Sequence, residues 1–120
     1  MTLLPDGIRV LEVSPAGGGA HVLWEVTGEC ACFRGHFEGD PLLPGITHLA
    51  LLADAATRLA GRARTISEVK SLRLRRPVRP GDRVHGTLEG PDADGRLRFD
   101  LRVEGGTAAS GVVVVVDAFA

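Results

Sequence analysis

The 120-residue sequence predicts a single α+β domain in which antiparallel strands wrap around one long helix. Alternating apolar and polar stretches come first, then a segment from 46 to 60 that is apolar on nearly every side, and then further alternating stretches. Short runs rich in glycine and proline join these segments, and no linker stands out. We therefore expect one domain over residues 1–120.

Composition excludes several classes of protein. Aromatic residues make up 4% of the chain, so aliphatic side chains must supply the core. Cys30 and Cys32 are too close in sequence for an ordinary disulfide, and no Cys/His set has zinc-site spacing, so neither metal nor cofactor is expected. The first residues show neither a signal peptide nor a membrane span, which predicts a cytoplasmic protein.

The first half of the chain predicts a hairpin and a helix. Strands are expected over 8–14 and 20–27, with a glycine-rich turn between them and Val22, Trp24 and Val26 on one face. The helix is expected over 46–60, after Pro44. Because it is apolar all round, we expect it to be buried.

The second half predicts an antiparallel meander of short strands. Leu97, Phe99 and Leu101 alternate with charged residues, which indicates one packed and one solvated face. His21 and His85 fall on solvated faces of their strands. The expected strands are 65–75, 83–89, 96–104 and 107–116.

Positive charge is concentrated between residues 62 and 83, which include eight basic residues and only two acidic ones. Such a segment could bind an acidic protein or phosphate groups through charge attraction. Alternatively, it is a solvated strand face with no partner. Nucleic acid is not the expected partner, because no aromatic side chains interleave with the basic ones.

Two segments carry a resemblance to a known family. The sequence CFRGHFEGDPLLPGI, from Cys32 to Ile46, resembles the active-site loop of the hot-dog-fold 3-hydroxyacyl-acyl-carrier-protein dehydratases of fatty-acid and polyketide synthesis. The sequence LRLRRPVRPGD, from Leu72 to Asp82, resembles the strand and turn that follow the central helix in that family. The resemblance implies a hot-dog fold and a dimer whose active sites lie between subunits.

The resemblance also implies roles for individual residues. His36 would be the base that removes the C2 proton, and the backbone N–H of Gly45, at the helix N-terminus, would stabilise the thioester oxygen. Pro41 and Pro44 would stiffen the loop that holds both groups. The expected substrate-binding residues are Phe37, Pro44, Ile46, Thr47 and Ala50.

The sequence departs from the family where the second catalytic residue belongs. Family members carry Asp or Glu fourteen residues after the histidine, and this chain has Ala50 there. Asp54, one turn further, would replace it, although Arg58 is placed to form an ordinary helical ion pair with Asp54. His48 is a second candidate, but it points away from the side of Ala50. In a third route, His36 alone returns the proton to the leaving hydroxyl.

The family partners are expected to be an acyl-carrier-protein thioester or a coenzyme A thioester. A homodimer or a higher hot-dog oligomer is expected, or a heterodimer with a paralogue that supplies the missing acid. Two alternatives remain open, namely a hot-dog acyl thioesterase using Asp54 and a non-catalytic subunit that binds acyl thioesters. The expected carrier-binding residues are Arg73, Arg75, Arg76 and Arg79.

Overall fold

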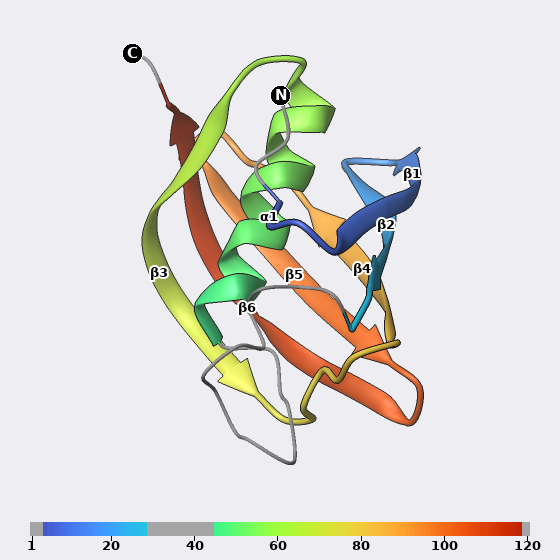
Figure 1. The fold of residues 1–120 in the computed structure, drawn as a ribbon. Helices are drawn as coiled ribbons and strands as arrows, with labels where there is room; N and C mark the ends of the chain where they lie inside the picture. Colours follow the sequence, from blue (N-terminus) through green and yellow to red (C-terminus); the bar gives the residue numbers. More distant parts are fainter. Residues whose placement is uncertain (1–3, 29–44, 119–120) are drawn as a thin grey trace.

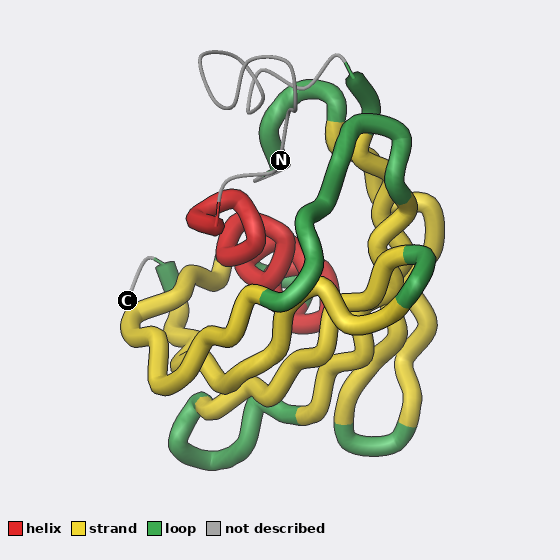
Figure 2. Tube along the Cα trace, turned by 90° about the horizontal axis from the view of Figure 1, so that it is seen from below, coloured by secondary structure: helices red, strands yellow, loops and turns green. Residues whose placement is uncertain are grey.

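The computed structural model describes residues 4–28 and 45–118, in which one helix lies against a six-stranded antiparallel sheet (Figure 1). The sheet curves around one side of the helix (Figure 2). This arrangement confirms the α+β class, and every expected element is present within a residue or two of its predicted ends. The elements are β1 (Ile8–Ala16), β2 (Gly19–Val26), α1 (Gly45–Ala60), β3 (Arg64–Leu74), β4 (Arg83–Glu89), β5 (Arg96–Val103) and β6 (Gly106–Asp117).

The strand order is β1-β2-β4-β5-β6-β3, which corrects the expected meander in one respect. Strands β4, β5 and β6 do form consecutive antiparallel pairs. β3 does not pair with β4, because β2 occupies that position through the register Glu25↔Arg83 to Gly19↔Glu89. β3 pairs instead with β6 and forms an edge of the sheet.

The core lies between the sheet and one face of α1. Trp24 is completely buried, and the neighbouring strand carries Gly86 where a Cβ would come within 2.6 Å of the indole ring. Leu51 and Leu52 bring the helix onto the same core, together with Phe99 from β5. The missing side chain at residue 86 therefore leaves room for the indole ring of Trp24 against β4.

The helix is not buried on all sides, which corrects the expectation of a fully buried helix. The side chain of Ile46 is 77% exposed, and Leu49, Ala50 and Ala53 are only partly buried. These four residues border a groove of about 400 Å³ between α1 and β3. A single sheet can cover only one face of a helix. The apolar strip on the other face of α1 is therefore not covered by this sheet.

The sheet face turned away from the helix is polar. In β4 and β5 buried apolar residues alternate with exposed polar ones, as the sequence predicts. His21 and His85 are exposed on this face, which confirms their expected position. At the opposite edge from β3, β1 carries a register shift between Val10 and Glu12.

Candidate active site

The predicted site residues divide between described and undescribed parts of the chain. His36, Phe37, Pro41 and Pro44 lie outside the described residues, as do Cys30 and Cys32. Gly45, Ile46, Thr47, Ala50 and Asp54 all lie on α1. The described part of the site is therefore the N-terminal half of this helix and the strand beside it.

Gly45 is the first residue of α1, one residue earlier than expected. Its backbone N–H is among those at a helix start that have no carbonyl partner within the helix. A Cβ on this residue would lie 3.2 Å from Leu74 Cδ1 at the end of β3. Gly45 thus lies where the helix N-terminus meets the edge strand.

The predicted substrate-binding residues of the helix lie on two different sides. Ile46 and Ala50 border the groove between α1 and β3. Thr47 is buried on the core side, and so is His48. The family position of the second catalytic residue, Ala50, therefore opens onto the groove, while His48 turns into the protein.

Asp54 is on the core side as well. It is 1% exposed, and its Oδ2 atom accepts a hydrogen bond from Arg58 Nε at 2.8 Å. The spacing of four residues had indicated this ion pair, and the structure contains it. Asp54 shares the buried face with Thr47, whereas Ala50 borders the groove, so the two candidate positions for the acid do not open onto the same space.

The four predicted carrier-binding arginines are all exposed, but they do not form one row. Arg73 borders a depression of about 560 Å³ on the outer face of the sheet, with Arg98 and Arg102 also on its rim. The backbone N–H groups of Arg75 and Arg76 both donate to Ala108 O, at 2.8 and 3.3 Å, which ties the segment after β3 to β6. The Arg76 side chain lies against the turn between β5 and β6, where a Cβ on Gly106 would come within 3.1 Å of Arg76 Nε.

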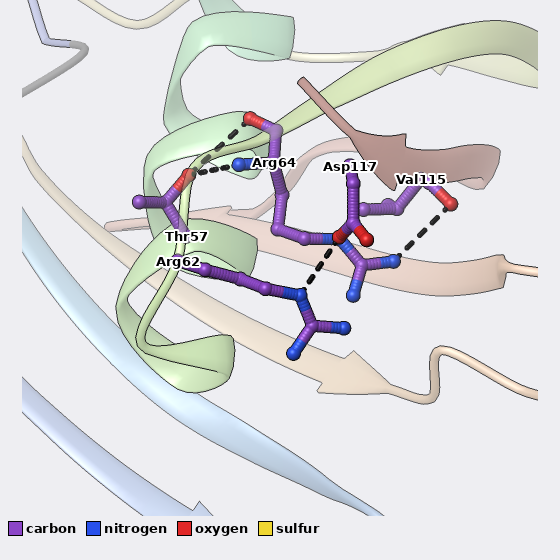
Figure 3. Close-up of polar contacts among 5 residues, drawn as sticks. All are labelled: Thr57, Arg62, Arg64, Val115 and Asp117. Carbon is purple, nitrogen blue, oxygen red and sulfur yellow. Dashed lines mark hydrogen bonds and ion pairs between the residues drawn. The ribbon is translucent and has the colours of Figure 1, made fainter. Parts of the chain in front are cut away.

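A polar cluster that sequence analysis did not predict lies at the C-terminal end of α1 (Figure 3). Thr57 Oγ1 accepts a hydrogen bond from Arg64 N at 3.0 Å, and Arg62 Nε donates to Asp117 Oδ1 at 2.8 Å. The Arg62 hydrogen bond, with the positive charges of Arg62 and Arg64, lowers the pKa of Asp117 below 3.8. Arg62 and Asp117 are 55 residues apart in the sequence, so no local pattern could have indicated their contact.

Across the stretches 4–28 and 45–118, no group of three or more His, Cys, Asp or Glu side chains is arranged to hold a metal ion. Within the same stretches, no helix combines the length and the apolar character that crossing a bilayer requires.

Comparison with known proteins adds a family to this geometry. The model of the ApeI-like family, described as ApeI dehydratase, matches residues 14–112. Among curated proteins, the chain is 34% identical over 88 residues to the 3-hydroxyacyl-[acyl-carrier-protein] dehydratase FabZ of Lactobacillus helveticus, covering 65% of this chain and 60% of that protein. It is 39% identical over 98 residues to the FabZ of Haemophilus influenzae, covering 70% and 66%. The chain thus spans about 60% of the first of these relatives.

Solved structures confirm the hot-dog fold. The dehydratase heterocomplex ApeI:P from Xenorhabdus doucetiae superposes with a TM-score of 0.78 at 22% identity, covering 89% of this chain and 96% of that one. An uncharacterized protein from Erwinia carotovora subsp. atroseptica superposes with a TM-score of 0.75 at 24% identity, covering 98% and 99%. At these identities the likeness concerns the fold.

Proposed function

Because the chain belongs to the ApeI-like dehydratase family, we propose that it acts in the cytoplasm as a dehydratase that removes water from a 3-hydroxyacyl thioester. The observation that carries this proposal is the family match over residues 14–112, which includes both the resembling loop and α1. The substrate would arrive on an acyl carrier protein or on coenzyme A, in fatty-acid or polyketide-type synthesis.

The elimination needs a base, a stabilised thioester oxygen and a proton for the leaving group. In this proposal, His36 takes the C2 proton, and the electron pair moves toward the thioester carbonyl. The Gly45 N–H, at the positive end of α1, stabilises the charge that develops on the carbonyl oxygen. The C3 hydroxyl then leaves as water after receiving a proton, and the enoyl thioester remains.

Asp54 is the carboxyl group proposed to assist the departure of the hydroxyl, because Ala50 carries only a methyl group. Its carboxyl group is bound to Arg58, so it would act from inside the helix and sheet interface, with Arg58 positioning it. The route that needs no second side chain has His36 return the proton it removed. These two routes differ in their dependence on Asp54.

The acyl chain is proposed to lie along α1. Phe37 and Pro44 would contact it from the loop, and Ile46 and Ala50 from the groove beside β3. Thr47, on the buried side, would shape the wall between the groove and the core.

The carrier is proposed to dock on the arginines that follow the helix, because carrier phosphates and acidic carrier surfaces are attracted by positive charge. Arg73, Arg75, Arg76 and Arg79 are exposed at the end of β3 and in the segment before β4. Their place near the N-terminus of α1 is supported by the approach of Leu74 to Gly45.

The assembly is proposed to be a hot-dog homodimer or a heterodimer with a paralogue. One observation favours a second candidate function, in which this chain binds acyl thioesters and a partner supplies the acid: Ala50 borders the groove and carries no titratable group. The thioesterase alternative would use the same buried Asp54 carboxyl group, bound to Arg58, to activate water or attack the thioester, and the release of free thiol distinguishes it.

The test uses the purified full chain with a 3-hydroxyacyl carrier thioester and follows both enoyl product and free thiol. The proposed function predicts enoyl product that is lost in His36→Ala. Free thiol that depends on Asp54 would identify a thioesterase. Retained acyl binding without either product would identify the non-catalytic subunit.

A further inference from the structure

A depression lies on the outer face of the sheet, the face turned away from α1. Its volume is about 560 Å³, which falls within the usual size range of small-molecule sites. Residues of β3, β4, β5 and β6 line it, and three arginines are among them: Arg73, Arg98 and Arg102. The depression therefore combines space for a small ligand with a concentration of positive charge.

Strand pairing places an aspartate near the centre of this depression. Asp100 on β5 lies opposite Thr87 on β4 and opposite Ser110 on β6. Ser110 in turn lies opposite Arg73 on β3. These residues form one row across the sheet, in which neighbours are about 5 Å apart. Arg73 is therefore two strands away from Asp100, with the Ser110 hydroxyl group between them.

The other two arginines flank Asp100 along its own strand. Arg98 and Arg102 are each two residues from Asp100, so the three side chains share the outer face at intervals of about 7 Å. Arg102 Nε lies 3.7 Å from Asp100 Oδ1, which is a loose contact. Within the described stretches of the chain, Arg73 and Arg98 form no ion pair. Two guanidinium groups on different strands are thus available to an anionic ligand.

This arrangement of charges fits a phosphate group. Guanidinium groups bind phosphate oxygens through paired hydrogen bonds, and a phosphate monoester carries about two negative charges at neutral pH. The hydroxyl groups of Ser71 and Ser110, which also line the depression, can donate further hydrogen bonds. The three arginines outnumber the two acidic residues of the lining, Glu89 and Asp100, so the depression keeps a net positive charge.

Asp100 indicates what else the ligand carries. Its side chain is 40% exposed and lines the depression, yet its Oδ1 atom accepts no hydrogen bond within the described part of the chain. This carboxylate would repel a second phosphate, and the surrounding arginines would repel a cationic group. A neutral hydroxyl group can donate to it without either repulsion, as ribose hydroxyls donate to carboxylates in dinucleotide-binding proteins. The lining therefore suits a ligand that combines a phosphate with a sugar.

We propose that this depression binds a sugar phosphate. The three arginines contact the phosphate, and Asp100 accepts a hydrogen bond from a sugar hydroxyl. Two kinds of ligand carry this chemistry, namely a free sugar phosphate and the ribose 3′-phosphate end of coenzyme A. Because the depression and α1 lie on opposite faces of the sheet, the inference does not depend on the proposed dehydratase activity.

The first test measures binding by calorimetric titration of the full chain at low salt. The probes are ribose 5-phosphate, ribose and inorganic phosphate, and we expect ribose 5-phosphate to bind about tenfold or more tightly than inorganic phosphate. Arg98→Gln should weaken ribose 5-phosphate binding about tenfold or more. Arg96→Gln removes the same charge at an exposed position of β5 outside the depression and should bind like the native protein. The variants are made on β5 because Arg73 is also proposed for carrier docking.

The second test separates a sugar phosphate site from a simple anion site. Asp100→Ala and Asp100→Asn remove the same negative charge, but only Asp100→Asn keeps an acceptor oxygen for a sugar hydroxyl. Asp100→Ala should therefore bind ribose 5-phosphate and inorganic phosphate about equally, whereas Asp100→Asn should still prefer ribose 5-phosphate. Circular dichroism and thermal melting check the fold of every variant.

Three results would each overturn the inference. The first is ribose 5-phosphate binding that is no tighter than that of inorganic phosphate. The second is ribose 5-phosphate binding that Arg98→Gln leaves unchanged, and the third is a preference for ribose 5-phosphate that survives Asp100→Ala. None of these measurements uses turnover, so a failure here is separate from a failure of the enoyl assay.

The source of the sugar phosphate is identified with coenzyme A and dephospho-coenzyme A, which lacks the 3′-phosphate. If coenzyme A binds more tightly and Arg98→Gln abolishes the difference, coenzyme A is the source. If the two bind equally, or if the difference survives Arg98→Gln, the site binds a free sugar phosphate.

Discussion

Arg58 Nε lies 2.8 Å from Asp54 Oδ2 across one turn of α1, and the Asp54 side chain is 2% exposed while that of Arg58 is 41% exposed. The pair links a buried carboxyl group to a side chain that reaches solvent. It gives Asp54 a structural role in addition to the catalytic one proposed for it, and the two roles make different predictions.

Asp54→Asn should lower enoyl formation by about 10²–10⁴-fold if its carboxyl group assists departure of the hydroxyl. Arg58→Ala removes only the positioning partner, so it should reduce turnover less and should change the pH profile of kcat. Both variants should lose roughly 1 kcal/mol of unfolding free energy, measured by urea denaturation. If both variants lose the same stability and keep native turnover, Asp54 has no catalytic role and only the route in which His36 returns the proton remains.

Gly45→Ala separates folding from chemistry at the start of α1. The added Cβ would lie 3.2 Å from Leu74 Cδ1, and Leu74 is 55% exposed and free to move aside. We expect thermal stability close to native but turnover lower by roughly 10–100-fold, because the methyl group displaces the thioester from the N–H. Gly28→Ala, with only an ordinary contact at 3.7 Å, is the control. Native turnover in Gly45→Ala would argue against the oxyanion role.

Arg75→Glu tests carrier docking. At low salt, kcat/KM for the carrier thioester should fall about tenfold, and the loss should shrink as salt is added because exposed charges are screened. Arg79→Glu should act in the same direction. Arg96→Glu makes an identical charge change at an exposed position of β5 outside the depression that Arg73 borders, and it should have little effect. If the Arg75 and Arg96 variants lose the same activity, the loss comes from net charge and not from docking at Arg75.

Gly86→Ala should destabilise the core. Its Cβ would come within 2.6 Å of Trp24 Cζ3 and 3.2 Å of Leu101 Cδ2, so two buried side chains would have to shift. Overpacking of this kind costs about 1–3 kcal/mol of unfolding free energy. Gly18→Ala, in the turn between β1 and β2 with open space around it, should be tolerated. Urea denaturation followed by Trp24 fluorescence measures both.

Asp117→Asn should make stability less dependent on acid. Hydrogen bonding from Arg62 lowers the folded-state pKa of Asp117 below 3.8, so its contribution is present above that pH and disappears as the pH falls through the folded value. The native protein should therefore melt higher than the variant near neutral pH, and the gap should shrink as the pH falls below 3.8 and close once it passes the lower folded-state pKa. Asp94→Asn, an exposed turn residue, should show no such gap.

Local patterns were sufficient to predict the elements but not their neighbours. Alternation located β4 and β5 because each has one buried and one solvated face. The place of β3 beside β6 depends on β2 having already taken the edge of β4, which is a long-range pairing. The exposure of Ile46 was missed for a related reason: an apolar helix face indicates that something covers it, without saying whether the cover belongs to the same chain.

The candidate site was predictable to the extent that it is local. A spacing of four residues indicated the pair between Asp54 and Arg58, and a helix start placed the Gly45 N–H. Asp54 lies in the core, whereas Ala50 borders the groove. This difference depends on the position of the sheet relative to α1, which only the tertiary structure shows.

The register shift in β1 makes that edge of the sheet a poor template for an added strand. In the described chain β1 lies at one end of the strand order and pairs with β2. There the shift between Val10 and Glu12, together with Pro15, which has no N–H, interrupts the ladder that another strand would need. This edge is thereby protected against edge-to-edge aggregation.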